Sequence, residues 1–113
     1  MITIYHNARC GKSRKCLAFL EDSNQEFEII KYLENVPTFK ELSDIIQKLN
    51  IKPIELVRQK EPIWIEKFKK IKLSDKQIIQ AMIDYPILIE RPIVVNGNKA
   101  IVARPLENIQ SII

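Results

Sequence analysis

The sequence predicts an α/β protein with four strands in one sheet and a helical insertion between the two halves of that sheet. Three observations support this fold class. The first third of the chain has a strand-helix-strand pattern, the middle repeats apolar residues at helical spacing, and a hairpin pattern follows near the end. Because 113 residues suffice for one hydrophobic core, we expect a single domain over 1–113, with the insertion at about 37–86.

The first third of the chain is expected to fold as strand, helix and strand. The segment ITIY (2–5) alternates and is rich in β-branched residues, which is typical of a strand. A helix is expected from about Gly11 to Asp22, because Cys16 and Leu20 would then lie on one side of it. The segment EFEIIKYL (26–33) predicts the second strand.

Two capping boxes mark helices in the middle of the chain. Thr38 and Glu41 form one box, Ser74 and Gln77 form the other, and apolar residues follow each at helical spacing. Proline is favoured in the first turn of a helix but cannot continue one. Prolines are therefore expected to open two short helices and to end the last one: Pro53, Pro62 and Pro86.

The last third of the chain is expected to form a hairpin and a closing helix. The segments PIVV (92–95) and KAIVA (99–103) flank NGN, and Asn-Gly tolerates the positive φ angles of a tight turn. Pro105 suits the first turn of a helix that would continue to Ile112. The element order is then β-α-β, several helices, and β-β-α.

The charge and aromatic patterns argue against a nucleic-acid-binding protein. The net charge is +4, but many lysines are spread through the expected helices, where they fit a solvated face. The aromatic residues are too scattered to form a stacking platform for bases. No apolar run is long enough to cross a membrane, and the start MITIYH lacks the features of a secretory signal. We therefore expect a cytoplasmic protein with no membrane partner.

The stretch HNARCGKSRKC (6–16) contains the one histidine and both cysteines of the chain. Cys10 falls where the first strand should give way to the first helix, and free N–H groups at a helix N-terminus favour an anion. Nearby cations would also favour a thiolate, and His6 would help if it is protonated and close. The alternative is an inert, packed cysteine.

Cys16 is expected to be a core residue and not a disulfide partner of Cys10. Six residues of helix rise roughly 9 Å, which exceeds the ~7 Å limit between bridged Cα atoms. Ser13 makes the local pattern Cys-x-x-Ser, so a disulfide at that spacing is excluded and an external thiol would have to complete any redox cycle. One histidine and two cysteines are also too few for a closed zinc site, so no metal is expected.

Three arginines are candidate anion ligands. Arg91 and Arg104 each precede a proline, which favours an extended backbone at an element boundary, and Arg58 lies in VRQKEP. Considered alone, each arginine is consistent with an ordinary surface cation. If all three converged on one thiolate, they would form a site for a tetrahedral oxyanion, because the planar guanidinium fork matches paired oxygens.

Four segments together resemble the glutaredoxin-coupled arsenate reductase family, which has a thioredoxin-like fold with a mixed four-stranded sheet. These segments are YHNARCGKSR, LVRQKEP, YPILIERPIVV and ARPLE, and they occur in the family's order and spacing. The resemblance implies that Cys10 is the nucleophile, with His6 near it and Ser13 helping to hold the thiolate. It also implies that Pro92 follows a cis peptide bond beside the active cysteine.

The resemblance implies a reaction as well. Arg58, Arg91 and Arg104 would bind arsenate or a similar oxyanion while the Cys10 thiolate attacks arsenic. Glutathione would then attack the adduct and release arsenite, and glutaredoxin would clear the remaining mixed disulfide. No bound cofactor or metal is implied, and we expect a monomer.

Two other functions stay open. The first is a thiol oxidoreductase of the same fold that acts on another substrate, such as a glutathionylated molecule. The second is a non-enzymatic regulator that binds RNA polymerase. Such regulators often carry Cys-x-x-Cys, whereas this chain has Ser13 in place of the second cysteine. Family membership does not by itself settle the substrate.

Overall fold

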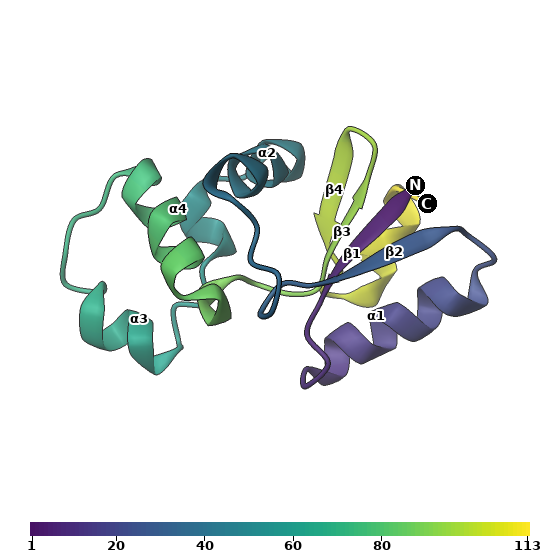
Figure 1. Cartoon of the computed structure of the whole chain (residues 1–113), viewed down its shortest axis with the longest axis horizontal. Helices are drawn as coiled ribbons and strands as arrows, with labels where there is room; N and C mark the ends of the chain where they lie inside the picture. The colour runs from purple at the N-terminus through teal and green to yellow at the C-terminus, as the bar shows by residue number, and fades with distance from the viewer. The chain divides into compact units, whose positions relative to one another are not determined.

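The structure is a computed structural model that describes residues 1–113 (Figure 1). The chain separates into two compact units. The sheet unit comprises residues 1–35 and 91–113, and the helical unit comprises residues 36–90. The helical unit covers nearly the same residues as the insertion expected at about 37–86. That the whole chain acts as one domain stays a prediction.

The sheet unit contains one four-stranded sheet in the order β2-β1-β3-β4. The central strand β1 pairs parallel with β2 and antiparallel with β3, and β3 pairs antiparallel with β4. This mixed sheet confirms the predicted fold class. The second strand is shorter than the expected 26–33. The strand bounds are Ile2–His6 for β1, Phe27–Lys31 for β2, Ile93–Asn96 for β3 and Lys99–Val102 for β4.

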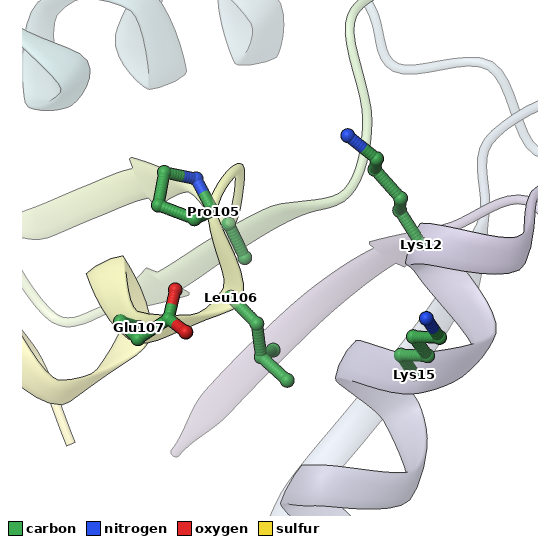
Figure 2. A pocket seen from close by; sticks show the side chains of 6 residues that line it. Lys12, Lys15, Pro105, Leu106 and Glu107 are labelled. Atoms are coloured by element: carbon green, nitrogen blue, oxygen red, sulfur yellow. The ribbon is translucent and has the colours of Figure 1, made fainter.

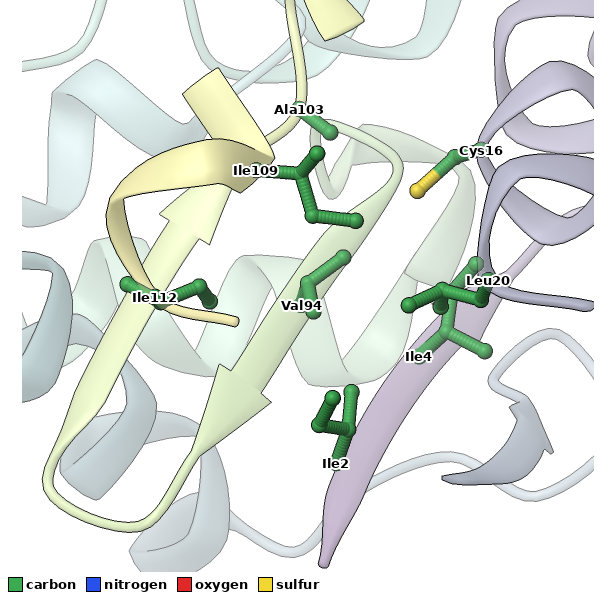
Figure 3. Packing of buried hydrophobic residues seen from close by; sticks show 8 residues of the cluster. All are labelled: Ile2, Ile4, Cys16, Leu20, Val94, Ala103, Ile109 and Ile112. Atoms are coloured by element: carbon green, nitrogen blue, oxygen red, sulfur yellow. The ribbon is translucent and has the colours of Figure 1, made fainter. Parts of the chain in front are cut away.

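Strand β1 and helix α1 (Gly11–Asp22) position the residues around Cys10. Side chains alternate along a strand, so Ile2, Ile4 and His6 all point to the buried face. Helix α1 covers this face with Cys16 and Leu20, which are both fully buried. The core cluster is visible in Figure 3, and its buried members are Ile2, Ile4, Cys16, Leu20, Val94, Ala103, Ile109 and Ile112.

The C-terminal segment differs from the sequence prediction. The hairpin forms as expected, with Gly97 at φ +61° in its turn. The closing segment η3 (Leu106–Ser111), however, is a 3₁₀ helix and not an α-helix, so that prediction is wrong. Its apolar residues Leu106, Ile109 and Ile112 are spaced three apart, and 3₁₀ geometry brings residues at that spacing onto one side. Ile109 and Ile112 are buried in the core as a result.

The helical unit contains α2 (Phe39–Leu49), α3 (Pro62–Lys67) and α4 (Asp75–Asp84). Both predicted capping boxes are present, one at the start of α2 and one at the start of α4. Pro62 opens α3, and α4 ends just before Pro86, as expected. Pro53 opens a short helix of the 3₁₀ type, η1 (Pro53–Leu56), and Pro86 begins a second 3₁₀ helix, η2 (Pro86–Leu88). No helix in the chain is both long enough and apolar enough to cross a membrane.

Candidate active site

Cys10 is the N-cap residue of helix α1. Its backbone is extended, with φ −92° and ψ 120°, so the helix begins directly after it at Gly11. The backbone N–H groups of Lys12 and Ser13 in the first turn interact with the sulfur and favour its thiolate form, which lowers the pKa of Cys10. The unpaired N–H groups of a helix N-terminus thus meet an anion, as the sequence predicts for this position.

Two arginines also reach the Cys10 sulfur. Nη2 of Arg104 donates to Sγ of Cys10 over 3.4 Å, and the guanidinium of Arg91 donates to the same atom. Nε of Arg104 donates to the backbone carbonyl of Arg91 over 2.5 Å, so the two segments that carry the arginines are joined. The Arg91–Pro92 and Arg104–Pro105 peptide bonds are both cis.

The pKa of Cys10 lies below the ordinary value for a cysteine. Burial raises it, but the hydrogen bonds from the Ser13 N–H, the Arg91 guanidinium and the Lys12 N–H, with the charge of Arg91, outweigh burial. Each of these groups stabilises the thiolate and not the thiol. The sulfur is therefore a stronger nucleophile near neutral pH than an ordinary cysteine, because only the thiolate attacks.

His6 and Ser13 contribute differently from what the sequence suggested. Nδ1 of His6 lies 2.6 Å from Oγ of Ser13, and the N–H of Asn7 donates to the same Oγ over 3.0 Å. The Ser13 hydroxyl therefore holds the end of β1, and it is the backbone N–H of Ser13 that contacts the sulfur.

The pKa of His6 is lowered, which corrects the idea that a protonated His6 assists Cys10. Burial is the largest cause, followed by the positive charges of Lys31 and Arg14. A neutral imidazole carries no charge to stabilise a thiolate. The Ser13 hydroxyl accepts the Asn7 N–H, and in the tautomer of neutral His6 that is protonated at Nε2 the hydroxyl donates its proton to Nδ1.

Asn7 is a positioning residue that the sequence reasoning missed. Its Oδ1 accepts a hydrogen bond from the N–H of Arg9 over 3.0 Å, and its carbonyl accepts one from the N–H of Cys10 over 3.0 Å. Together these bonds fold residues 7–10 into the turn that ends at Cys10. The sequence does contain a signal for this role, because an asparagine side chain commonly accepts a hydrogen bond from the backbone N–H two residues further along in such turns.

Cys16 is a core residue, as predicted. Its side chain is fully buried against the sheet, and burial raises its pKa to about 11. A thiol in that environment is neither ionised near neutral pH nor reachable by solvent. Both cysteines are free, and Cys16 has no feature of a resolving thiol for Cys10.

Arg58 lies in the helical unit, where it has carboxylate partners. Its Nη1 donates to Oε1 of Glu90 over 2.9 Å, and its Nε lies 3.8 Å from Oε2 of Glu61. Its backbone N–H donates to the carbonyl of Leu88 over 2.7 Å. Glu90 is distant from Arg58 in the sequence, and Glu61 belongs to an ordinary charged segment, so no sequence motif predicts either ion pair. A role for Arg58 in anion binding stays a prediction.

Comparison with known proteins identifies the family. The ArsC family model matches residues 5–112, which is nearly the whole chain. The chain belongs to the ArsC family. It is 40% identical over 114 residues to a protein named arsenate reductase from Neisseria meningitidis serogroup A, covering 99% of this chain and 97% of the relative. It is 36% identical to a protein of the same name from Haemophilus influenzae, with coverage of 99% and 98%.

A solved ArsC-family structure has the same fold. The structure named arsenate reductase from Vibrio cholerae matches with a TM-score of 0.94 and 39% sequence identity, covering 99% of this chain and 97% of that one. This agreement confirms the expected thioredoxin-like fold.

The geometry of this ArsC-family site suits attack on an electrophile that carries negative oxygens. A stabilised thiolate supplies the nucleophile, and two guanidiniums beside it supply donors for charge on the oxygens. Nowhere do His, Cys, Asp and Glu side chains gather in groups of three that could hold a metal ion. The thiolate and the two guanidiniums are equipped for nucleophilic thiol chemistry with electrostatic assistance.

Proposed function

We propose that this protein reduces arsenate to arsenite through a covalent adduct on Cys10. The observation that carries the proposal is the approach of two guanidiniums, Arg91 and Arg104, to one thiolate at a helix N-terminus. Ordinary thiol-disulfide exchange needs the thiolate, but the disulfide sulfur that reacts carries no anionic oxygens for two arginines to bind. The names of the relatives at 36–40% identity also support an arsenate substrate.

In the first step, the Cys10 thiolate attacks arsenic(V) of hydrogen arsenate. A sulfur–arsenic bond forms, the bond from arsenic to the hydroxyl oxygen breaks, and the hydroxyl takes up one proton from solvent and leaves as water. Arg91 and Arg104 neutralise charge on the remaining oxygens, and Arg58 is the third proposed anion ligand. Charge-assisted hydrogen bonds of this kind are the strong ones, and they strengthen as charge develops.

In the second step, an external thiol completes the reduction. Glutathione, as thiolate, attacks the Cys10 sulfur, the sulfur–arsenic bond breaks, and its electron pair stays on arsenic as arsenite leaves. Glutaredoxin then attacks the glutathione sulfur of the mixed disulfide and releases the Cys10 thiolate. The burial of Cys16 supports this dependence on external thiols, because the chain has no other cysteine. We propose that the protein does this as a cytoplasmic monomer.

The direct test is arsenate-dependent NADPH oxidation in the presence of glutathione, glutaredoxin and glutathione reductase. We expect turnover by the wild-type protein and none by Cys10→Ser, with Cys16→Ala as the matched thiol control that keeps turnover. Omission of glutaredoxin should slow the cycle at the mixed disulfide, which mass spectrometry of the intact protein would detect. If the wild type turns over arsenate no faster than Cys10→Ser but reduces a glutathionylated substrate, the protein is a thiol oxidoreductase and the proposal is wrong.

A further inference from the structure

A cavity of about 230 Å³ opens in the sheet unit beside the start of helix α1. Figure 2 shows Lys12 and Lys15 on the α1 side of the cavity, and Pro105 and Leu106 on the other side. Ala103 and Glu107 complete its lining. Both lysine side chains are exposed, and most of the opposite wall is apolar.

The cavity adjoins the Cys10 sulfur through two connections. Arg104, whose Nη2 reaches the sulfur over 3.4 Å, is followed directly by Pro105 of the cavity wall. On the other side, the backbone N–H of Lys12 lowers the pKa of Cys10 while the Lys12 side chain lines the cavity. Cys10 itself does not line the cavity, but a molecule longer than the cavity would extend from it toward the sulfur.

The charges of the cavity select the chemistry of that molecule. Lys12 and Lys15 are three residues apart and share one face of α1, so their ammonium groups can meet the same anion. Glu107 stands on the other wall and disfavours a compact, highly charged anion, but it can pair with an ammonium group. The apolar surface of Ala103 and Leu106 suits carbon atoms between the charged groups. Arsenate alone does not fit these features, whereas an amino-acid or peptide chain does.

The helix rise between Cys10 and Lys15 gives an approximate scale for the molecule. Lys15 is five residues beyond Cys10, which corresponds to a rise of about 7.5 Å along the helix. An extended peptide spans about 3.3–3.6 Å per residue, so this separation corresponds to roughly two residues. We propose that the cavity binds the carboxylate end of a peptide thiol whose sulfur reacts at Cys10, with Lys15 as the principal anion ligand; this rests on the thiol-dependent function proposed above.

The first test measures binding without any reaction. S-methylglutathione has the carboxylates and the ammonium group of glutathione but cannot form a disulfide. Titrated into the full-length ¹⁵N-labelled protein, it should shift the amide signals of Lys15, Leu106 and Glu107 in a saturable manner. Lys15→Gln should weaken this binding by about two- to five-fold, the range for an exposed ion pair. Lys99→Gln, which removes the same charge from the exposed start of β4, should bind like the wild type.

The second test measures reaction at Cys10 without arsenate. The thiolate attacks one sulfur of a disulfide reagent, which forms a protein mixed disulfide and releases the other half as a thiolate. The reagents are 5,5′-dithiobis(2-nitrobenzoate), which carries a carboxylate on each half, and neutral 4,4′-dithiodipyridine. In a Cys16→Ala background, Lys15→Gln should lower the ratio of the anionic to the neutral rate constant by about two- to five-fold. The control Lys99→Gln should preserve the ratio.

These outcomes separate the cavity from the arsenate reaction. Saturable shifts at the cavity amides and a lowered rate ratio would support the subsite even if the protein failed to reduce arsenate. Absence of shifts at Lys15, Leu106 and Glu107 at the highest soluble ligand concentration, or shifts confined to other residues, would overturn it. An equal rate ratio in Lys15→Gln and Lys99→Gln would overturn the assignment of Lys15, whatever the arsenate assay shows.

Discussion

Replacing Arg104 with lysine keeps a positive charge near Cys10 but removes a side chain that reaches two acceptors. In the structure, Nη2 of Arg104 donates to the Cys10 sulfur over 3.4 Å while Nε donates to the Arg91 carbonyl over 2.5 Å. A lysine ammonium is a single point donor and cannot reproduce this planar arrangement. We therefore expect Arg104→Lys to fold but to bind the arsenate oxygens poorly and to leave the Arg91 segment less well held.

The size of the loss follows from the interaction removed. A hydrogen bond to a charged group contributes ~1.5–3 kcal/mol, and each 1.4 kcal/mol changes a rate about ten-fold. Losing the bond to the developing anion should therefore lower kcat/KM for arsenate by about ten- to a hundred-fold. Alkylation of Cys10 by neutral iodoacetamide should fall much less, because that reaction needs the thiolate but no ligand for oxygens.

The assay compares four proteins under one set of conditions. Arsenate-dependent NADPH oxidation and iodoacetamide alkylation are measured for the wild type, Arg104→Lys, Arg91→Lys and Arg9→Lys. Arg9 is the matched control, because it is close to Cys10 in sequence but its side chain is exposed. Circular dichroism establishes that each variant folds. If Arg104→Lys and Arg91→Lys fold and reduce arsenate at the wild-type rate, the two guanidiniums are not oxyanion ligands and the proposed substrate loses its main support.

Three further predictions concern the titrating groups. In Cys16→Ala, the alkylation rate of Cys10 should rise with pH to a midpoint below ~8.5, the value for a free cysteine; a midpoint at or above that value contradicts an activated thiolate. Cys16→Ala itself should retain turnover and lose about 0.5–3 kcal/mol of unfolding free energy, measured by urea denaturation. Loss of turnover in a folded variant would instead support an internal disulfide between Cys10 and Cys16. Because the pKa of His6 is lowered on folding, the unfolded state binds the proton more tightly. Stability should therefore fall as pH drops below ~6.5, and His6→Gln should flatten this dependence; an unchanged slope would show that His6 is not responsible.

Local patterns were sufficient to predict most of the fold. Three of these patterns depend only on neighbouring residues, so the sequence predicts them directly: the β-branched alternation of β1, the change to helical spacing in α1, and the Asn-Gly turn. The closing segment was misjudged because Pro105 and three apolar residues fit an α-helix nearly as well as a 3₁₀ helix. What separates the two is the fit of Ile109 and Ile112 against the sheet, which is a tertiary property.

The candidate site was predictable in its centre but not in its surroundings. Cys10 could be placed because a strand, a turn and a helix follow one another along the chain, and the helix N-terminus predicts an anion there. The approach of Arg104 to Cys10 joins residues 94 positions apart, so spacing alone could not reveal it. Ser13 acts on the thiolate through its backbone N–H while its hydroxyl bonds His6 and Asn7, and no sequence pattern predicts this division. The cavity beside Lys15 depends on the same long-range packing and left no pattern in the sequence.

The burial of Cys16 also affects whether an oxidised Cys10 can be returned to its thiolate form. A thiolate attacked by peroxide becomes a sulfenic acid, which a nearby thiol normally captures before further oxidation to the irreversible sulfinic form. Cys16 cannot do this, because it is fully buried in the core with its pKa raised to about 11. Rescue of Cys10 therefore depends on how quickly a small thiol from solution reaches the sulfur. We therefore expect the concentration of small thiols around the protein to set how long Cys10 stays active during oxidation.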